Sequence, residues 1–357
     1  MRPAKQAQRG GQGSEQYQAA GDIIIHQGVT EERVRAIMEE ETRRLVEEYS
    51  SEAHAAIEAR IGHLDDRLLP LLADAGALDA FADPAMIRAY RKAQEGAASS
   101  ERELDYDMLA ALIAKRVESP RERPVVAGID RAIEIMDRVD ERALRGLTAA
   151  YALTAWTPAV GSITAGLESL DGIFRRVIDG DLPTGTEWLD HLDILDAMRV
   201  GTSGLGGMKT IELYYGEQLN GYVAPGVEAP GPEFVGGAFP DSAWGSAVVD
   251  HELKPGHRRL STVSKADFDK ELLAQHNRDD FNDEVISQAA SVFGLGQQDE
   301  TARAALRARI AEMPHLGPFA DWWDDLKEAS FQLTSVGRAL ARANCFRLDP
   351  EGYLPRD

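Results

Sequence analysis

The chain has 357 residues, with 60 acidic and 39 basic side chains and a formal net charge of −21. This acidic balance argues against binding to nucleic acid or to an anionic membrane over a large surface. The single cysteine, Cys345, excludes an internal disulfide and a multi-cysteine metal site. No apolar run approaches the roughly 18 residues of a membrane span, and residues 1–20 lack the apolar core of a signal peptide. We therefore expect a cytoplasmic protein.

The N-terminal 28 residues combine a polar arm with a β signal. Residues 1–20 are rich in Gly and Gln and predict a flexible arm. Ile23, Ile24 and Ile25 follow, and three β-branched side chains between glycines favour a short strand over a helix. One short strand is unstable alone in water, and no convincing partner strand lies nearby in the sequence. We expect it to pair with a second copy of the chain, which makes these isoleucines the self-association residues and the protein a homo-oligomer.

Most of the remaining chain has the apolar period of helices. Thr30 is suited to cap a helix, and apolar residues at three- and four-residue steps predict one long helix, straight or bent, over residues 30–69. The helical period continues to residue 200, and one apolar stripe runs from Trp188 to Met198. Further predicted helices cover 209–219, 265–274, 283–293, 299–312 and 319–329. A short extended segment at 331–334 precedes the last helix, which begins at Ser335.

These patterns predict a mainly α fold, a multi-helix bundle with one short N-terminal β-strand and a C-terminal helical lobe. Six glycines and four prolines in residues 221–245 predict a linker or long loop. The expected organisation is an arm and β segment at 1–28, an all-α body at 29–220, this linker, and a C-terminal lobe at 246–357. The predicted strand, helix cap and helix at the end of the chain are compatible with a winged-helix-like C-terminal lobe.

Two motifs, one rich in glycine and one with two histidines, are weak candidates for a phosphate-binding loop and for a catalytic or metal site. The glycine cluster at 201–207 is followed by Lys209. A phosphate-binding loop requires its lysine two residues earlier, at the position of Gly207, and no apolar strand precedes the cluster. His251, Glu252 and His257 are similar in composition to a zinc-protease helix, but the histidines are six residues apart and Pro255-Gly256 would break a helix. These three residues are weak catalytic candidates, and we expect no metal or cofactor.

A basic run surrounds the second histidine. Arg258 and Arg259 are its central residues and are weak candidates for contact with nucleic acid. Acidic residues follow directly at 267, 269 and 271, and no aromatic residues are interleaved. A solvated charged face is the favoured interpretation, and nucleic acid is not the expected partner.

Three stretches together resemble an uncharacterised bacterial family of hypothetical proteins. They are residues 16–37, the acidic helical body to about residue 220, and residues 331–340, whereas the insert at 221–245 departs from the pattern. The Gly/Gln-rich opening is also similar to short N-terminal tags on bacterial conflict and antiphage proteins. The resemblance implies a bacterial cytosolic setting and a defence context, and it brings no catalytic residues.

The favoured function is a non-enzymatic assembly or interaction protein within an antiphage or stress-response system. It would self-associate through the N-terminal β segment and the long helix, and it could bind a further protein partner. One alternative is a hydrolase-like or metal-dependent enzyme with its site at the loops 201–207 and 246–257. The other alternative is a winged-helix-like protein that binds nucleic acid.

Overall fold

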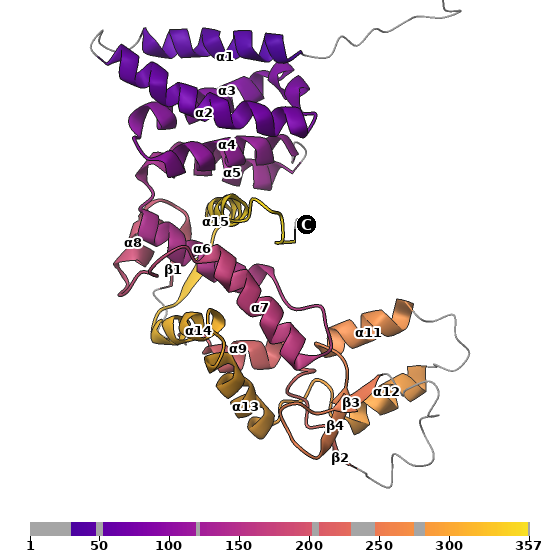
Figure 1. Ribbon diagram of the computed structural model, residues 1–357. Helices are drawn as coiled ribbons and strands as arrows, with labels where there is room; N and C mark the ends of the chain where they lie inside the picture. Colours follow the sequence, from indigo (N-terminus) through magenta and orange to yellow (C-terminus); the bar gives the residue numbers. More distant parts are fainter. Residues whose placement is uncertain are drawn as a thin grey trace, which may run out of the picture.

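The computed structural model describes residues 30–47, 53–118, 122–201, 207–229, 247–274 and 283–355. The fold is mainly α, as predicted, and the helices stack into an elongated body (Figure 1). The predicted strand at Ile23–Ile25 and the arm before it lie outside the described residues.

The N-terminal half is a stack of helices in which α1 is outermost (Figure 1). Its elements are α1 (Glu31–Val46), α2 (His54–Asp74), the 3-10 turn η1 (Leu78–Ala82), α3 (Pro84–Ser99), α4 (Glu103–Glu118), α5 (Arg123–Ile135) and the 3-10 turn η2 (Met136–Arg138). The prediction of one long helix over 30–69 is wrong, because α1 and α2 are separate helices that pack together. Leu45 and Val46 of α1 share a buried cluster with Ile57 and Ile61 of α2. Folding back buries both halves of the apolar stripe, which a single helix at the end of the stack would leave exposed.

The middle of the molecule contains the end of the chain. It is built from α6 (Glu141–Ala155), α7 (Ile163–Val177), α8 (Glu187–Ile194), the antiparallel strands β1 (Met198–Val200) and β5 (Phe331–Leu333), and α15 (Ser335–Leu348). Helix α15 packs against α4, α5 and α6 (Figure 1). Its predicted cap is confirmed, since the Thr334 hydroxyl accepts a hydrogen bond from the backbone N–H of Gly337. The predicted stripe from Trp188 to Met198 is only partly helical, because α8 ends at Ile194 and Met198 begins β1.

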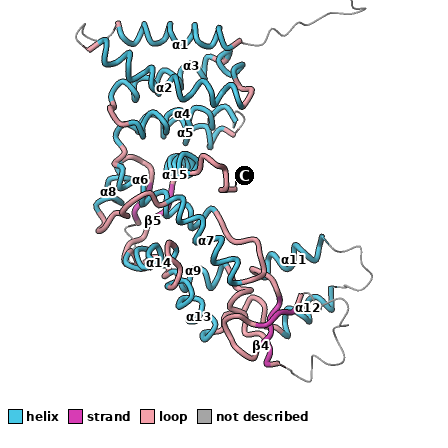
Figure 2. Tube along the Cα trace, viewed as in Figure 1, coloured by secondary structure: helices cyan, strands magenta, loops and turns pink. Residues whose placement is uncertain are grey.

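The C-terminal half adds helices and a small sheet. Its helices are α9 (Ile211–Gln218), α11 (Lys265–Ala274), α12 (Asp283–Val292), α13 (Glu300–Ala311) and α14 (Leu316–Asp325), all close to the predicted ranges. The strands β2 (Val227–Glu228), β4 (His257–Leu260) and β3 (Val248–Asp250) form an antiparallel sheet in that order, which the sequence reading did not predict. Figure 2 shows this sheet beside α11 and α12, with which it shares a small apolar core.

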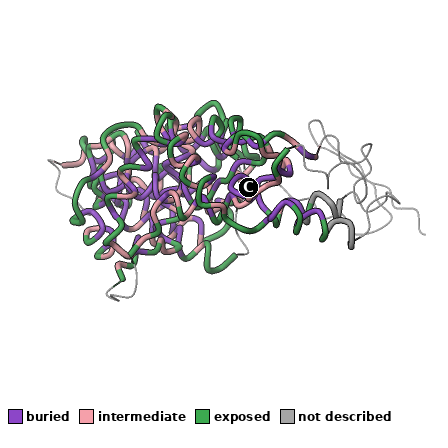
Figure 3. Tube along the Cα trace, turned by 90° about the horizontal axis from the view of Figure 1, so that it is seen from below, coloured by how far each residue is buried: buried purple, intermediate pink, exposed green. Residues whose placement is uncertain are grey.

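One large apolar core connects the N-terminal stack with the middle of the molecule. It extends from Val34 in α1 to Leu354 near the end of the chain. Viewed from below, buried residues follow the inside of the body and exposed residues its outer edge (Figure 3). The candidate functional residues lie either at the small sheet, which has a separate core, or around α1, at opposite ends of the molecule (Figure 1).

Candidate functional site

Residues 251–256 form the turn of a β-hairpin. The His251 N–H donates a hydrogen bond to the His257 carbonyl across the neck of this turn, at 2.8 Å. Gly256 adopts a φ of +80°, a conformation that favours glycine. The motif is therefore a tight connection between β3 and β4, and the two histidines meet through their backbones.

The imidazole of His251 is buried and both of its nitrogens are occupied. Its Nε2 lies 3.0 Å from the Ala224 carbonyl, so it carries the proton and donates it. Its Nδ1 accepts a hydrogen bond from the Leu253 N–H at 3.2 Å. Burial lowers the pKa of His251, which keeps the ring neutral. With its one ring lone pair already used, His251 is a structural residue of the hairpin.

Glu252 caps the first turn of α7 from a distant part of the sequence. Its carboxylate accepts hydrogen bonds from the backbone N–H groups of Ile163 and Thr164, at 2.9 and 2.8 Å, and from the Thr164 hydroxyl at 2.6 Å. Burial acts to raise the pKa of Glu252, but these hydrogen bonds outweigh it and lower the pKa. A carboxylate whose oxygens are already bonded and whose pKa is lowered is a poor general base.

Arg259 connects the sheet to α7 from inside the protein. Its side chain is fully buried, and it donates hydrogen bonds to the carbonyls of Gly161 and Leu260, at 2.6 and 2.9 Å. Its guanidinium also lies 3.4 Å from the carboxylate of Glu252. The adjacent Arg258 donates to the Val248 carbonyl at 3.2 Å. The two arginines therefore do not form one basic surface, and Arg259 is not exposed to a nucleic-acid phosphate.

The weak catalytic candidates are close in the sequence but have separate environments. His251 faces Ala224, Glu252 faces the start of α7, and the Nδ1 of His257 lies 3.5 Å from the Pro255 carbonyl. Across the described ranges, no three His, Cys, Asp or Glu side chains are grouped so that they could hold a metal ion. No strand was predicted before the glycine cluster at 201–207. The strand β1 does precede it, but β1 is only three residues long.

An open groove at the other end of the molecule was missed by the sequence analysis. It lies between α1, η1 and the start of α3 and has a volume of about 620 Å³. We call it the apolar groove, and its lining residues are Arg33, Ala36, Ile37, Glu40, Glu41, Phe81, Ala82 and Ile87. Ile37 belongs to the apolar stripe of α1 but is only half-buried, whereas its neighbours Val34 and Met38 are buried. Because three separate elements form this groove, no local sequence pattern marks it.

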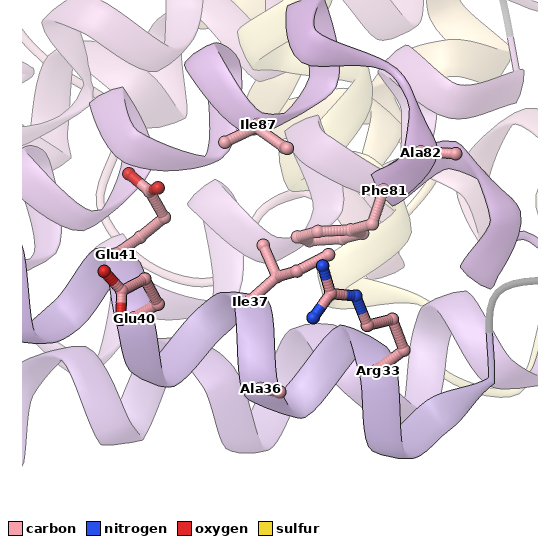
Figure 4. A pocket seen from close by; sticks show the side chains of 8 residues that line it. All are labelled: Arg33, Ala36, Ile37, Glu40, Glu41, Phe81, Ala82 and Ile87. Carbon is pink, nitrogen blue, oxygen red and sulfur yellow. The ribbon is translucent and has the colours of Figure 1, made fainter.

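Charged side chains stand at both ends of the apolar groove (Figure 4). At one end, Glu41 forms ion pairs with Arg44 and Arg91, both at 2.9 Å, and Glu40 pairs with Arg44 at 3.2 Å. At the other end, Figure 4 shows the Arg33 guanidinium beside Ile37 and Phe81. No described carboxylate lies within 4 Å of this guanidinium. The carboxylates are thus paired with arginines of the same chain, whereas Arg33 offers a positive charge to the groove.

A second groove runs between α1 and α2 and is more acidic. It has a volume of about 550 Å³, and its lining includes Glu39, Asp65 and Asp66. Asp65 accepts a hydrogen bond from the Tyr90 hydroxyl at 2.6 Å, and Gln94 donates hydrogen bonds both to Tyr90 at 2.8 Å and to Thr42 at 2.9 Å. This network joins α1, α2 and α3 beneath the groove.

We expect Asp65→Asn to remove a pH dependence of stability. Burial, partly offset by the Tyr90 hydrogen bond, raises the pKa of Asp65 to about 6. The folded protein then holds this proton more tightly than the unfolded chain, so stability falls as the pH rises from about 4 to about 6. A two-unit shift corresponds to roughly 3 kcal/mol, and partial exposure reduces our expectation to about 2 kcal/mol.

The measurement is urea unfolding of both proteins near pH 4.5, 6 and 7.5. At each pH, the free energy of unfolding of the natural chain is subtracted from that of Asp65→Asn. This difference should increase by about 2 kcal/mol from pH 4.5 to pH 7.5. Asp74→Asn is the matched control, because Asp74 is exposed at the end of the same helix and takes no part in the network around Asp65. A difference for Asp65→Asn that stays constant with pH would contradict the expectation.

Comparison with known proteins gives a family for most of the chain. A family model that is described only as ":-like" matches residues 28–350. The chain belongs to this family. The family is uncharacterised, which agrees with the resemblance found in the sequence, and the match does not include the Gly/Gln-rich opening. No curated protein and no solved structure matches the chain.

A helix must be both long and apolar to cross a membrane. Across the described ranges, no helix is both long enough and apolar enough to cross a membrane. The assignment to the family brings no activity.

Proposed function

We propose that the protein is a non-enzymatic interaction protein that self-associates through Ile23–Ile25. The observation that carries this proposal is the apolar groove, an open concave surface beside α1, the first described helix after this segment. Concave apolar surfaces with a few polar groups at their rim are typical of binding sites. The buried apolar side chains of α1 pack within the chain, so the contact would involve its groove side and not its buried stripe.

The alternative functions receive less support from the geometry. An enzyme at the hairpin would need free side chains, but His251 and Glu252 are engaged in internal hydrogen bonds. A nucleic-acid surface at the same place would need exposed cations, and Arg259 is buried. The bacterial cytoplasmic setting, and a role in antiphage defence or stress response, belong to the proposal through the resemblance alone.

The proposal is tested by the molar mass of the chain in solution, measured by size-exclusion chromatography with light scattering. We expect the full chain to have at least twice the monomer mass. A variant with Ile23, Ile24 and Ile25 replaced by serine, and a shortened chain that begins at Val29, should both have the monomer mass.

Far-ultraviolet circular dichroism provides the control for folding. The serine variant should keep its helical signal, because the substituted residues precede the described helices. A monomeric full chain at all accessible concentrations would refute the proposal, as would an oligomer whose mass does not change in the serine variant.

A further inference from the structure

We infer that the apolar groove of one copy binds the segment Asp22–Ile25 of a second copy. This inference rests on the proposed self-association and assigns the surface that receives the segment. Three independent properties of the chain support it: the aliphatic side chains in the groove, the position of Arg33, which pairs with no described carboxylate, and the length of the connection to α1.

The groove offers an apolar wall that fits aliphatic side chains. Ile37 from α1 and Ile87 from α3 are half-buried, and Phe81 from η1 is buried between the two helices. Ala36 and Ala82 are exposed, and their small side chains keep the groove open. Its volume of about 620 Å³ is within the range of pockets that enclose small ligands or short peptide side chains. Three consecutive isoleucines would gain free energy by covering the exposed parts of Ile37, Ile87 and the two alanines, whereas Phe81 is already covered.

The charge at the end of the groove matches the charge next to the isoleucines. Arg33 has no described carboxylate within 4 Å, and it lines the same groove as Ile37 and Phe81 (Figure 4). Asp22 directly precedes Ile23, so an aspartate at Arg33 would place the isoleucines along Ile37 and Ile87. A guanidinium and a carboxylate form strong charge-assisted hydrogen bonds. The carboxylates at the far end are already paired within the chain and do not compete for Arg33.

The length of the connection favours a second copy over the chain's own groove. With Asp22 at Arg33, an extended segment of about 10 Å would bring Ile25 level with Glu40. Glu40 is about 15 Å along the helix from Thr30, at about 1.5 Å per residue. The four residues between Ile25 and Thr30 span at most about 18 Å and would have to return almost fully stretched along α1. A segment from a second copy has no such constraint.

The inference is tested by reversing the two charges in the full chain. Arg33→Glu and Asp22→Arg should each weaken self-association by about tenfold or more, because both place like charges together. The double variant Asp22→Arg/Arg33→Glu should recover most of the affinity. Arg35→Glu is the matched control, because Arg35 is exposed on the same helix, pairs with Glu31 and does not line the apolar groove. Dissociation constants come from light scattering or sedimentation over a concentration series.

A mixture of the two single variants distinguishes binding between copies from binding within one chain. The Asp22→Arg chain keeps an intact groove and the Arg33→Glu chain keeps an intact segment, so their equimolar mixture should form a heterodimer that neither variant forms alone. Recovery in the double variant without recovery in the mixture would place the segment in its own groove and overturn the inference.

The outcomes also separate this inference from the proposed function. If Arg33→Glu assembles like the natural chain while the Ile23–Ile25 serine variant is monomeric, the groove assignment fails and the self-association proposal stands. If the natural chain is monomeric, both fail. Circular dichroism of Arg33→Glu should match that of the natural chain, since Arg33 is exposed.

Discussion

A Gly337→Ala chain is expected to lose about 3 kcal/mol of its free energy of unfolding. Gly337 lies in the first turns of α15, where an added Cβ would overlap the carbonyl oxygen of Ala197. That carbonyl cannot move freely, because it accepts a hydrogen bond from the Thr334 N–H at 3.2 Å. Because α15 packs against α4, α5 and α6, displacing it would disturb several helices together. Overpacking of this kind typically costs about 1–3 kcal/mol, and a clash with backbone lies at the upper end.

The measurement is urea unfolding, followed by circular dichroism, of this variant and of Gly62→Ala. Gly62 lies inside α2, and an added Cβ there would have no atom within 4 Å. Alanine should therefore stabilise that helix by about 0.5–1 kcal/mol, because it restricts the unfolded chain and favours the helix. Equal effects of the two substitutions would show that α15 does not need the close approach at Gly337.

Replacing Arg259 by methionine is expected to cost about 3 kcal/mol of stability. The substitution leaves the carbonyl of Gly161 without its buried donor and removes the cation beside Glu252. Breaking a buried pair by removing one partner typically costs about 3–5 kcal/mol, and Glu252, whose side chain is 27% exposed, keeps some hydration. The small sheet should then separate from the start of α7 before the N-terminal stack unfolds.

Thermal unfolding and hydrogen exchange of Arg259→Met measure the total loss of stability and its location. Arg138→Met is the matched control, because the Arg138 side chain is 66% exposed and should contribute less than about 1 kcal/mol. Faster exchange confined to β3, β4 and the start of α7 is the expected pattern. Arg259→Met with the stability of the control would show that the buried guanidinium does not hold the sheet in place.

The elements that could be predicted from the sequence are those with local signals. The hydroxyl cap and the apolar spacing after it were sufficient to predict α15, and the predicted ranges of α11 and α13 are also close to the observed ones. The break between α1 and α2 was not predicted, because the apolar stripe continues through it and only packing shows that its halves face each other. Strands of two to four residues likewise carry too little pattern to be distinguished from loops.

The roles of the candidate site residues depended on contacts that are distant in the sequence. Glu252 is 88 residues from Thr164 and Arg259 is 98 residues from Gly161, so nothing near the hairpin indicated their structural roles. The apolar groove was missed for the same reason. Ile37 belongs to the apolar stripe that predicted a helix, but that stripe does not show that η1 and α3 leave its side chain half-buried.

The position of α15 has a consequence for how the protein is made. During synthesis, α4, α5 and α6 leave the ribosome long before residues 335–348, the residues that cover them. Until then the nascent chain keeps an apolar surface open in its middle, and closing it joins segments that are about 200 residues apart. Long-range closure of this kind is slow and exposes intermediates to aggregation. A chain interrupted before α15 would remain incomplete at its centre, where chaperones and proteases recognise unfinished proteins.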